Sequence, residues 1–511
     1  MTLYPASEFP NTRLAFEAAV AALSNEAALG LDHGEVERLA QVRGQEFMRC
    51  LYQDHLDLRA EREKAMIEPM RGSDGQVRTE VRPSSRPLGS LFGSVVVHRL
   101  ALVRHGVPGG LRPLDAHLNL PEGLYSEGVQ REVVWNVAQG SYDAAVENVR
   151  RTSAATIAKR QAEDLVVNIT RDFKSYYLQE PTQVAPSTHF MVLTFDGAGV
   201  VMRPESLRPE TRKRAGKAGR KVSVAESAAS GRRRDDERKN RKRMAEVAAV
   251  YSLEPASRTP EDVIGELRRT GPRSERPKAQ NKRVWASLEE SVLDVVDYAF
   301  YEAHQRDPEQ EQRWVAVVDG NQDQLAAIQR MAYNYEVDVT TVIDFIHVLG
   351  YLWKAGKVIN GDGATPTEVE KWVSERAKRI LCGESSTVAA GMRRAATRRG
   401  LEGKARAAVD DCANYLLNHK KFLRYHEYLR DGLPIATGVI EGACRSLVKD
   451  RMDITGARWG LEGGEAVLKL RSLRASGDLD EYLAYHRAQE LERNHLRHYH
   501  DTELTELRLA A

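Results

Sequence analysis

The sequence predicts an α/β protein with a mainly helical N-terminal region. Two short apolar runs each end in an aspartate followed by a glycine, VLTFDG (192–197) and VAVVDG (315–320). Such apolar, partly β-branched runs are typical of buried strands in a sheet that helices cover on both faces. Apolar residues at helical spacing fill residues 12–66 and most of residues 360–430, which predicts long helical stretches before and after the strands.

Composition indicates a multidomain protein without membrane spans or disulfide bonds. The chain has 511 residues, 42% of them hydrophobic, which suits two to four domains with at least one sizeable core. No run of 18 apolar residues occurs, so we expect no membrane span, and the early acid Glu8 argues against a secretory signal. The four cysteines form no CxxC pair, which predicts reduced thiols in a cytoplasmic protein rather than a zinc or disulfide framework.

Residues 1–124 are predicted to be a helical region with a short β segment, whose best strand candidate is SVVVHRLALV (94–103). Residues 125–170 are predicted to hold three short helices, near 126–138, 141–150 and 153–165. Four basic residues lie near the third helix: Arg150, Arg151, Lys159 and Arg160. This pattern resembles a helix-turn-helix that binds DNA, although a small helical bundle without DNA contact would look the same.

A long polar stretch, residues 203–284, contains the densest basic runs of the chain, RKRAGKAGRK (212–221) and GRRRDDERKNRKR (231–243). The second run has eight basic and three acidic residues, an excess of five. Because lysine and arginine neutralise DNA phosphates and release counterions, we predict a DNA-binding arm. A solvated loop without a ligand is the alternative. Three consecutive arginines are the predicted DNA contacts: Arg232, Arg233 and Arg234.

Three acids form the candidate chemical site: Asp196, Asp319 and Glu441. Each aspartate follows its apolar run, and the residue after a strand lies at the carboxyl edge of the sheet, where open α/β sheets place their ligands. Glu441 lies in TGVIEGACRSLVKDRM, in the first turn of a predicted helix. Taken singly, each acid has a plainer interpretation, because aspartates cap helices and an acid in a first turn complements the helix dipole.

Three carboxylates suit chemistry with two metal ions. Mg²⁺ takes oxygen ligands and keeps several waters, so a few carboxylates suffice to hold it. In two-metal phosphoryl transfer one ion activates a water or a 3′-hydroxyl, and the other stabilises the leaving 3′-oxygen. The predicted cofactor is therefore a pair of Mg²⁺ ions, with Mn²⁺ as a substitute, held by Asp196, Asp319 and Glu441.

Two further motifs carry a resemblance to a known family. The longer is GLPIATGVIEGACRSLVKDRMDITGARWGLEGGEAVLKLRS (432–472), which surrounds Glu441. The shorter is DFIH, in which Asp344 follows Asp319 by 25 residues (344 − 319) and His347 ends the motif. With these motifs the chain resembles bacterial insertion-sequence transposases of the ISKra type, within the DDE superfamily that includes Mutator-like transposases.

The resemblance implies an RNase H-like catalytic core at residues 185–475, with a basic insertion (about 203–284), a helical insertion (about 360–430) and a helical C-terminal tail (476–511). It implies the following roles: Asp196, Asp319 and Glu441 as catalytic and metal-binding acids, and Asp344 and His347 as an accessory motif. The implied activity is cleavage and strand transfer of insertion-sequence ends. The implied partners are double-stranded DNA, as terminal inverted repeats and target, and further copies of the chain in a homodimer or larger synaptic assembly. The implied location is the bacterial cytoplasm, at the nucleoid.

Residues after Glu441 are further candidates for DNA contact. The predicted phosphate contacts are Arg445, Lys449, Arg451 and Arg458. Trp459 is predicted either to stack on a flipped base or to lie in the core. Two other functions stay open: a structure-specific nuclease on the RNase H-like fold, and a transposase-derived DNA-binding protein without catalysis. Residues 95–115 lack the cysteines of the zinc-ribbon-like segment that family members often carry, so we expect no zinc-stabilised module.

Overall fold

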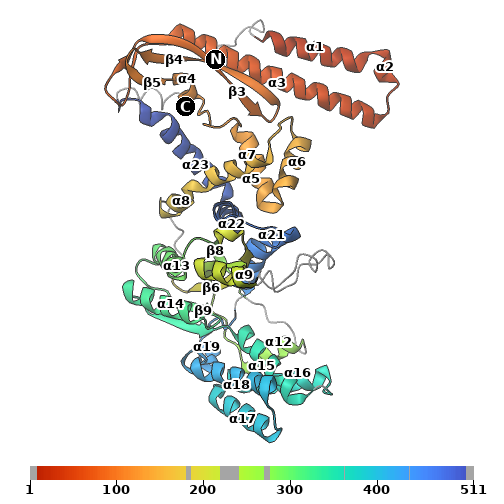
Figure 1. Ribbon diagram of the computed structural model, residues 1–511, viewed down its shortest axis with the longest axis vertical. Helices are drawn as coiled ribbons and strands as arrows, with labels where there is room; N and C mark the ends of the chain where they lie inside the picture. Colours follow the sequence, from red (N-terminus) through yellow and green to blue (C-terminus); the bar gives the residue numbers. More distant parts are fainter. Residues whose placement is uncertain are drawn as a thin grey trace. The chain divides into compact units, whose positions relative to one another are not determined.

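The chain is a mixed α/β protein, as the sequence predicts (Figure 1). The computed structural model describes residues 9–179, 186–218, 241–269, 277–361, 363–436 and 438–501. The chain divides into two compact units: unit 1 is Met1–Gln179 with Asp478–Ala511, and unit 2 is Glu180–Gly477. Among the described residues, no helix has both the length and the apolar content that crossing a membrane requires.

Unit 1 contains a three-stranded antiparallel sheet in the order β3-β4-β5. Its strands are β3 (Glu80–Ser90), β4 (Gly93–Arg104) and β5 (Val107–Leu111), and a separate pair is formed by β1 (Met70–Arg71) and β2 (Val77–Arg78). The predicted strand at 94–103 is β4, but the β segment is larger than predicted. The sequence did not predict strand β3, because it carries Pro83 and Pro87, and only an edge strand tolerates proline.

The long helix α3 covers the sheet of unit 1. The helices of this unit are α1 (Pro10–Ser24), α2 (Glu26–Leu29), α3 (His33–Met66), α4 (Pro113–His117), α5 (Glu127–Gln139), α6 (Tyr142–Thr152), α7 (Lys159–Ile169), α8 (Phe173–Gln179) and α23 (Leu479–Asn494). The side-chain amide of Gln53 in α3 donates to the carbonyl oxygen of Val96 and accepts from its N–H, each at 2.8 Å. Leu56 packs below this contact with apolar residues of the sheet: Leu88, Val95 and Val97.

Helices α5, α6 and α7 correspond to the three short helices expected between residues 125 and 170. The third begins at Lys159 rather than at 153, because Ser153 ends α6 with its N–H bonded to the carbonyl oxygen of Val149. Valines form the core between the three helices: Val133, Val149 and Val166. DNA contact by these helices stays a prediction. The predicted helical tail is not a separate region, because α23 belongs to unit 1, where its Tyr482 side chain is buried.

Unit 2 is built on a five-stranded mixed sheet in the order β10-β9-β6-β7-β8. The strands are β6 (Phe190–Val201), β7 (Lys242–Leu253), β8 (Gln280–Ser287), β9 (Trp314–Val318) and β10 (Val339–Ile343). Strands β6, β7 and β8 pair antiparallel, whereas β9 runs parallel to β6 and β10 parallel to β9. The sheet therefore combines an antiparallel half with a parallel half that meet at β6.

Two expectations for this sheet are wrong. The polar stretch 203–284 is not one insertion, since it contains all of β7 and the start of β8. Strand β7 is built from small apolar residues, and its basic first residues, Lys242 and Arg243, belong to the second basic run. Asp196 also does not end its strand, because β6 continues to Val201 by pairing with β7 after its pairing with β9 has stopped.

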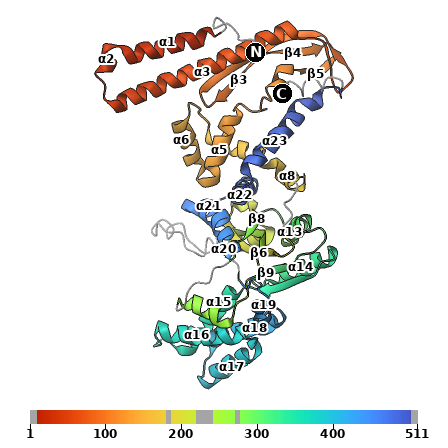
Figure 2. The same cartoon turned by 180° about the vertical axis from the view of Figure 1, so that it is seen from behind.

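Helices surround the sheet of unit 2, and α15 to α19 gather at one end of this unit in both views (Figures 1 and 2). The helices are α9 (Pro209–Ala218), α12 (Pro260–Arg268), α13 (Val292–Arg306), α14 (Gln322–Asn334), α15 (Phe345–Asn360), α16 (Pro366–Leu381), α17 (Ser385–Arg398), α18 (Gly403–Asn418), α19 (Tyr425–Arg430), α20 (Gly438–Ala443), α21 (Asp450–Met452) and α22 (Leu461–Ser476). Helix α22 lies along the edge strand β8. There the hydroxyl oxygens of Ser472 and Ser476 accept the backbone N–H groups of Ala286 and Val284, at 3.3 and 3.0 Å. An edge strand with its donors covered in this way offers no template for pairing with another chain.

A buried ion-pair group joins β8 to α13. The carboxylate of Glu302 lies between the guanidinium groups of Arg283 and Arg306, and all three side chains are buried. Burial alone would raise the pKa of Glu302, but the two arginines outweigh it and hold the pKa below the ordinary value. The group therefore stays charged in the core and ties the helix to the sheet.

We predict that Glu302→Ala lowers the free energy of unfolding of unit 2 by about 3–5 kcal/mol, because two buried guanidinium groups lose their carboxylate. Urea unfolding followed by tryptophan fluorescence measures the change. Glu309→Ala, which removes an exposed acid just after the same helix, serves as the control and should change it by less than about 0.5 kcal/mol. Equal effects of the two substitutions would contradict the role given to Glu302.

Candidate active site at the edge of the sheet

Asp196 and Asp319 come from neighbouring parallel strands. The register pairs Met191 with Trp314 and ends with Phe195 opposite Val318, so each aspartate is the next residue beyond the last pair. Because the strands run in the same direction, both carboxylates lie at one edge of the β6–β9 pair. The sequence predicted this edge correctly from the two apolar runs, even though β6 itself continues past Asp196.

The helix that carries Glu441 packs against Asp196. Cys444 follows Glu441 by three positions, on the same side of the helix, and its buried thiol donates to Asp196 Oδ2 at 3.2 Å. The other oxygen, Oδ1, accepts the backbone N–H of Gly197 at 2.7 Å. Burial, followed by the charge of Asp196, raises the pKa of Cys444, so the thiol keeps the proton that it donates. Through this contact the helix that carries the exposed third acid packs against the first acid.

The helix of Glu441 changes its winding directly after this contact. Residues Cys444–Lys449 form a π-helix between α20 and α21, a feature that is frequent at functional sites. Arg471 in α22 donates from Nε to the carbonyl oxygens of Ser446 and Leu447, at 3.1 and 2.9 Å. Burial lowers the pKa of Arg471 to about 10, with further contributions from Arg451 and Arg474. Positive charge is therefore concentrated behind the helix that presents Glu441.

The turn that carries Asp319 is held by helix α18. The hydroxyl of Tyr415 donates to the carbonyl oxygen of Asp319 at 2.6 Å, and the ring of Tyr415 stacks on Tyr351 of α15 with centroids 4.2 Å apart. Gly320 has φ +92°, and a Cβ there would lie 3.0 Å from His419 Nε2. The same imidazole nitrogen lies 3.1 Å from the carbonyl oxygen of Gly320. The helical region between β10 and Glu441 thus fixes the backbone of the second acid.

The accessory motif lies beside the second acid. Asp344 follows β10, is buried, and accepts the N–H of Ile346 at 2.7 Å as the N-cap of α15. His347 is exposed, and its Nε2 lies 3.8 Å from Asp319 Oδ2. The two residues therefore differ in their surroundings: Asp344 shapes the start of the helix, while His347 faces the carboxylate.

Negative charge accumulates at this edge. Glu246 in β7 pairs with Gly197, the residue after Asp196. The pKa of Glu246 is raised, first by burial and then by nearby carboxylates, against which Arg208 acts. The carboxylates that raise it are Asp196, Asp323 and Asp319. Like charges held this close favour a bound cation, which would relieve their repulsion.

The predicted DNA contacts divide into three groups. Arg445, Lys449 and Arg458 are exposed, and Arg445 lies 3.6 Å from Asp450. Arg451 corrects the prediction, because it is buried with its guanidinium 4.8 Å from the ring centre of Trp459 and is not presented to a phosphate. Trp459 is a core residue: its backbone is bonded to the end of β6, and its Nε1 donates to the carbonyl oxygen of Met452 at 3.1 Å. The remaining predicted contacts lie outside the described residues: Arg232, Arg233 and Arg234.

Sequence reasoning missed three residues: Cys444 and Tyr415, which bond to Asp196 and to the backbone of Asp319, and His419, which contacts Gly320 in the turn after Asp319. Cys444 had a signal, because it follows Glu441 at a spacing of three on a predicted helix. Tyr415 and His419 had none, since they lie almost 100 residues after Asp319 and only the folded chain brings them to its turn.

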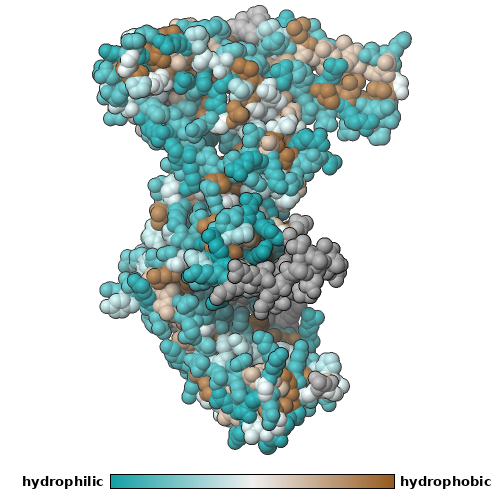
Figure 3. Space-filling view, viewed as in Figure 1, coloured by the Kyte–Doolittle hydropathy of each residue, from teal (hydrophilic) through white to brown (hydrophobic). Residues whose placement is uncertain are grey.

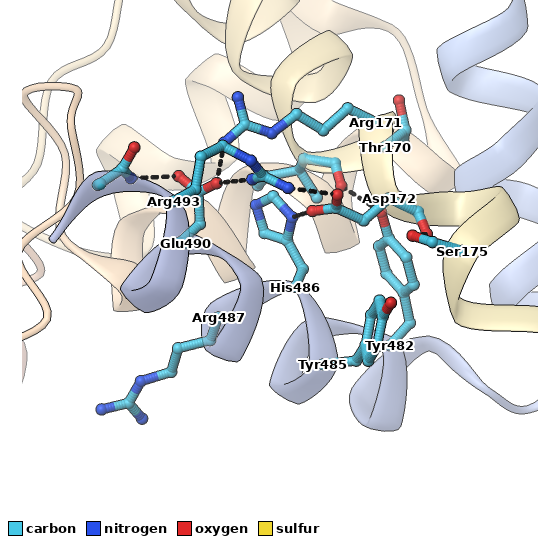
Figure 4. A network of polar contacts seen from close by, with 12 residues as sticks. Thr170, Arg171, Asp172, Ser175, Tyr482, Tyr485, His486, Arg487, Glu490 and Arg493 are labelled. Carbon is cyan, nitrogen blue, oxygen red and sulfur yellow. Dashed lines mark hydrogen bonds and ion pairs between the residues drawn. The ribbon is translucent and has the colours of Figure 1, made fainter. Parts of the chain in front are cut away.

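A second polar group lies within unit 1, where α23 meets Asp172 (Figure 4). His486 Nδ1 lies 2.7 Å from Asp172 Oδ2, and Arg493 donates to Asp172 Oδ1 at 2.5 Å. Glu490 accepts from Arg171 and Arg493. Asp172, His486 and Glu490 bring one ligand atom each within 4.8 Å of one another, so the group could hold a metal ion. Two guanidinium groups already balance the charge of its two carboxylates. A metal ion would have to displace these guanidinium groups.

Comparison with protein-family models and with curated proteins gives no match to this chain. The chemistry of the edge site must therefore be argued from its own residues.

We predict that unit 1 loses stability as the pH falls through the depressed pKa of Asp172. Burial would raise that pKa, but His486 and Arg493 outweigh it and hold it below 3.8. A carboxyl group whose pKa is lower in the folded protein binds a proton more readily in the unfolded chain. Its contribution to the stability of unit 1 is therefore present above about pH 4 and is lost as the pH falls below that value. Thermal unfolding of unit 1 is measured between pH 6 and pH 3. The unfolding temperature of Asp172→Asn should start lower than that of the wild type and should fall less over this pH range. Parallel profiles for the two proteins would contradict this assignment.

Proposed function

We propose that this protein is a DDE-type transposase, in which Asp196, Asp319 and Glu441 cut and join DNA strands by two-metal phosphoryl transfer. One observation carries the proposal. Two carboxylates end the pairing of neighbouring parallel strands, and the helix of a third acid is bonded to the first of them through Cys444.

The sheet of unit 2 supports the proposal. An RNase H-like core, which the resemblance implies, has three antiparallel strands followed by two further strands parallel to the first and on its other side. Strands β6, β7 and β8 are antiparallel, and β9 and β10 follow on the other side of β6 in parallel. A fold alone does not define an activity, so the argument rests on the acids that this sheet places.

The residues present suit Mg²⁺, because the described residues at this edge offer several carboxylate oxygens, and the thiol among them, Cys444, is protonated. When bound, two such ions activate the attacking oxygen and stabilise the leaving oxygen of an in-line displacement. Asp196 and Asp319 would supply ligand oxygens from the two strands, and Glu441 would supply the third carboxylate from α20. His347, 3.8 Å from Asp319, stands where it can contact a phosphate or a water of the reacting strand.

DNA is the proposed substrate, and positive charge lies next to the acids. Arg445 and Lys449 are exposed on the π-helix that follows Glu441, and Arg458 is exposed a few residues further on. Such side chains neutralise phosphates. Their place beside Glu441 directs a phosphate backbone toward the carboxylates, whose own charge would otherwise repel it. Action in the bacterial cytoplasm stays part of the proposal.

We predict that Asp196→Asn, Asp319→Asn and Glu441→Gln each lower the rate of DNA cleavage about a thousandfold or more, since each removes a metal ligand worth several kcal/mol in the transition state. The measurement uses labelled DNA from both flanks of the chain's own coding sequence, with Mg²⁺. Asp338→Asn is the matched control, because this exposed acid precedes β10 at the opposite edge of the sheet. Cleavage without joining would indicate a nuclease, and DNA binding without cleavage a non-catalytic protein; both outcomes would overturn the proposal.

We also predict that Tyr415→Phe raises the Mg²⁺ concentration for half-maximal cleavage by roughly tenfold, because the turn of Asp319 loses a hydrogen bond worth about 1–1.5 kcal/mol. The ring and its stacking on Tyr351 are kept. Tyr428→Phe is the control: its hydroxyl donates to the carbonyl oxygen of Thr341 at 3.3 Å, away from both aspartates. A Mg²⁺ requirement that changes equally in both variants, or in neither, would show that Tyr415 does not position Asp319.

A further inference from the structure

Helices α1 and α3 lie side by side and are joined at one end by α2 (Figures 1 and 2). Residues 10–49, here called the arm, contain almost nothing that is buried. Helix α1 has no buried residue, the buried residues of α3 begin at Cys50, and within the described residues 10–49 only Ala28 is buried. The arm is therefore a pair of helices without a core of its own.

Large apolar side chains are nevertheless concentrated on the arm. Leu29 is 78% exposed, Leu14 65% and Val42 62%. The other large apolar residues exposed on the arm are Phe16, Val20, Leu31 and Met48. Figure 3 shows patches of hydrophobic surface among the polar surface over α1 and α3. Several exposed apolar residues gathered on one short segment favour a site of protein interaction, whereas single exposed apolar residues are ordinary.

The arm is well defined in its local structure. Asp54 fixes the start of α1 by accepting from the side chains of Asn11 and Thr12, both at 2.7 Å. At the other end, Asp32 and Glu35 form a capping box that starts α3. The caps therefore specify the two helices, whose exposed apolar side chains are left uncovered in the single chain.

Charge along the arm indicates which partner fits. The tip, residues 25–38, carries Glu26, Asp32, Glu35 and Glu37 against one base, a net charge of −3 (1 − 4). The root, residues 10–24 and 39–49, carries Arg13, Arg43 and Arg49 against two acids, a net charge of +1 (3 − 2). An acidic tip does not suit DNA. It does suit the root of an identical arm laid against it in the opposite direction.

We propose that the arm is a dimerisation surface, on which a second copy of this chain packs its own arm tip to root to form a four-helix bundle. The same patch serves both copies, as a two-fold interface requires. The bundle covers the apolar residues of both arms and places each acidic tip beside a basic root. The proposal rests on the exposed surface of unit 1 and does not depend on the reaction proposed for unit 2.

Sedimentation velocity of the full-length chain tests the surface. We expect a dimer whose dissociation constant rises at least about a hundredfold in the double variant Val20→Glu, Val42→Glu, because the interface would bury two carboxylates in each copy. Both positions are exposed in the single chain, so circular dichroism should show that the fold is kept. Tyr333→Glu, at an 83% exposed position in α14, is the control and should leave the dimer unchanged. A wild type that is monomeric at tens of micromolar, or a double variant that dimerises as wild type does, would overturn the proposal.

Cross-linking tests the direction of pairing. The chains carry Cys382→Ser, which removes the exposed native thiol, and one cysteine on the arm under mild oxidation. Val20→Cys, midway along α1, should cross-link with its own copy. Leu29→Cys at the tip and Leu14→Cys near the root should cross-link only when the two chains are mixed. Self-cross-linking of Leu29→Cys would show that the arms pack in parallel. The absence of a cross-link from all of these positions would show that the arms do not meet. Either result would overturn the tip-to-root arrangement.

Discussion

The candidate site of unit 2 depends on one constraint, the strand register that places two carboxylates at one edge of the β6–β9 pair. Asp196 and Asp319 are placed there by strand register, which no side-chain movement can relax. Their charges, together with burial, raise the pKa of Glu246 in the next strand. Such a concentration of like charge costs free energy unless hydrogen bonds and cations offset it. The edge therefore holds negative charge that a bound cation would offset.

Two of the hydrogen bonds to these acids come from segments remote in the sequence. Cys444 gives Asp196 a donor that burial keeps protonated, and Tyr415 holds the carbonyl oxygen of Asp319. The helices between β10 and Glu441 thus set the position of the second acid, Asp319. The π-helix after Glu441 is likewise held by a distant residue, because Arg471 of α22 donates to its carbonyl oxygens.

The sequence predicts those features whose cause is local. Asp196 and Asp319 were found because a buried strand and the acid that follows it are adjacent in the chain, and Glu441 stood out in a long motif. Features that depend on pairing between distant segments were missed or wrong. Strand β7 was hidden in a basic stretch, since its apolar residues are small and its first residues are Lys242 and Arg243. Arg451 looked like a phosphate contact because nothing near it in sequence shows that Trp459 covers it.

The most direct test of the account is the anomalous scattering of Mn²⁺ in crystals of the protein bound to DNA. The account predicts two Mn²⁺ ions roughly 4 Å apart, coordinated by Asp196, Asp319 and Glu441. Crystals with no ion at these acids, or with Mn²⁺ bound only at Asp172, His486 and Glu490, would contradict it.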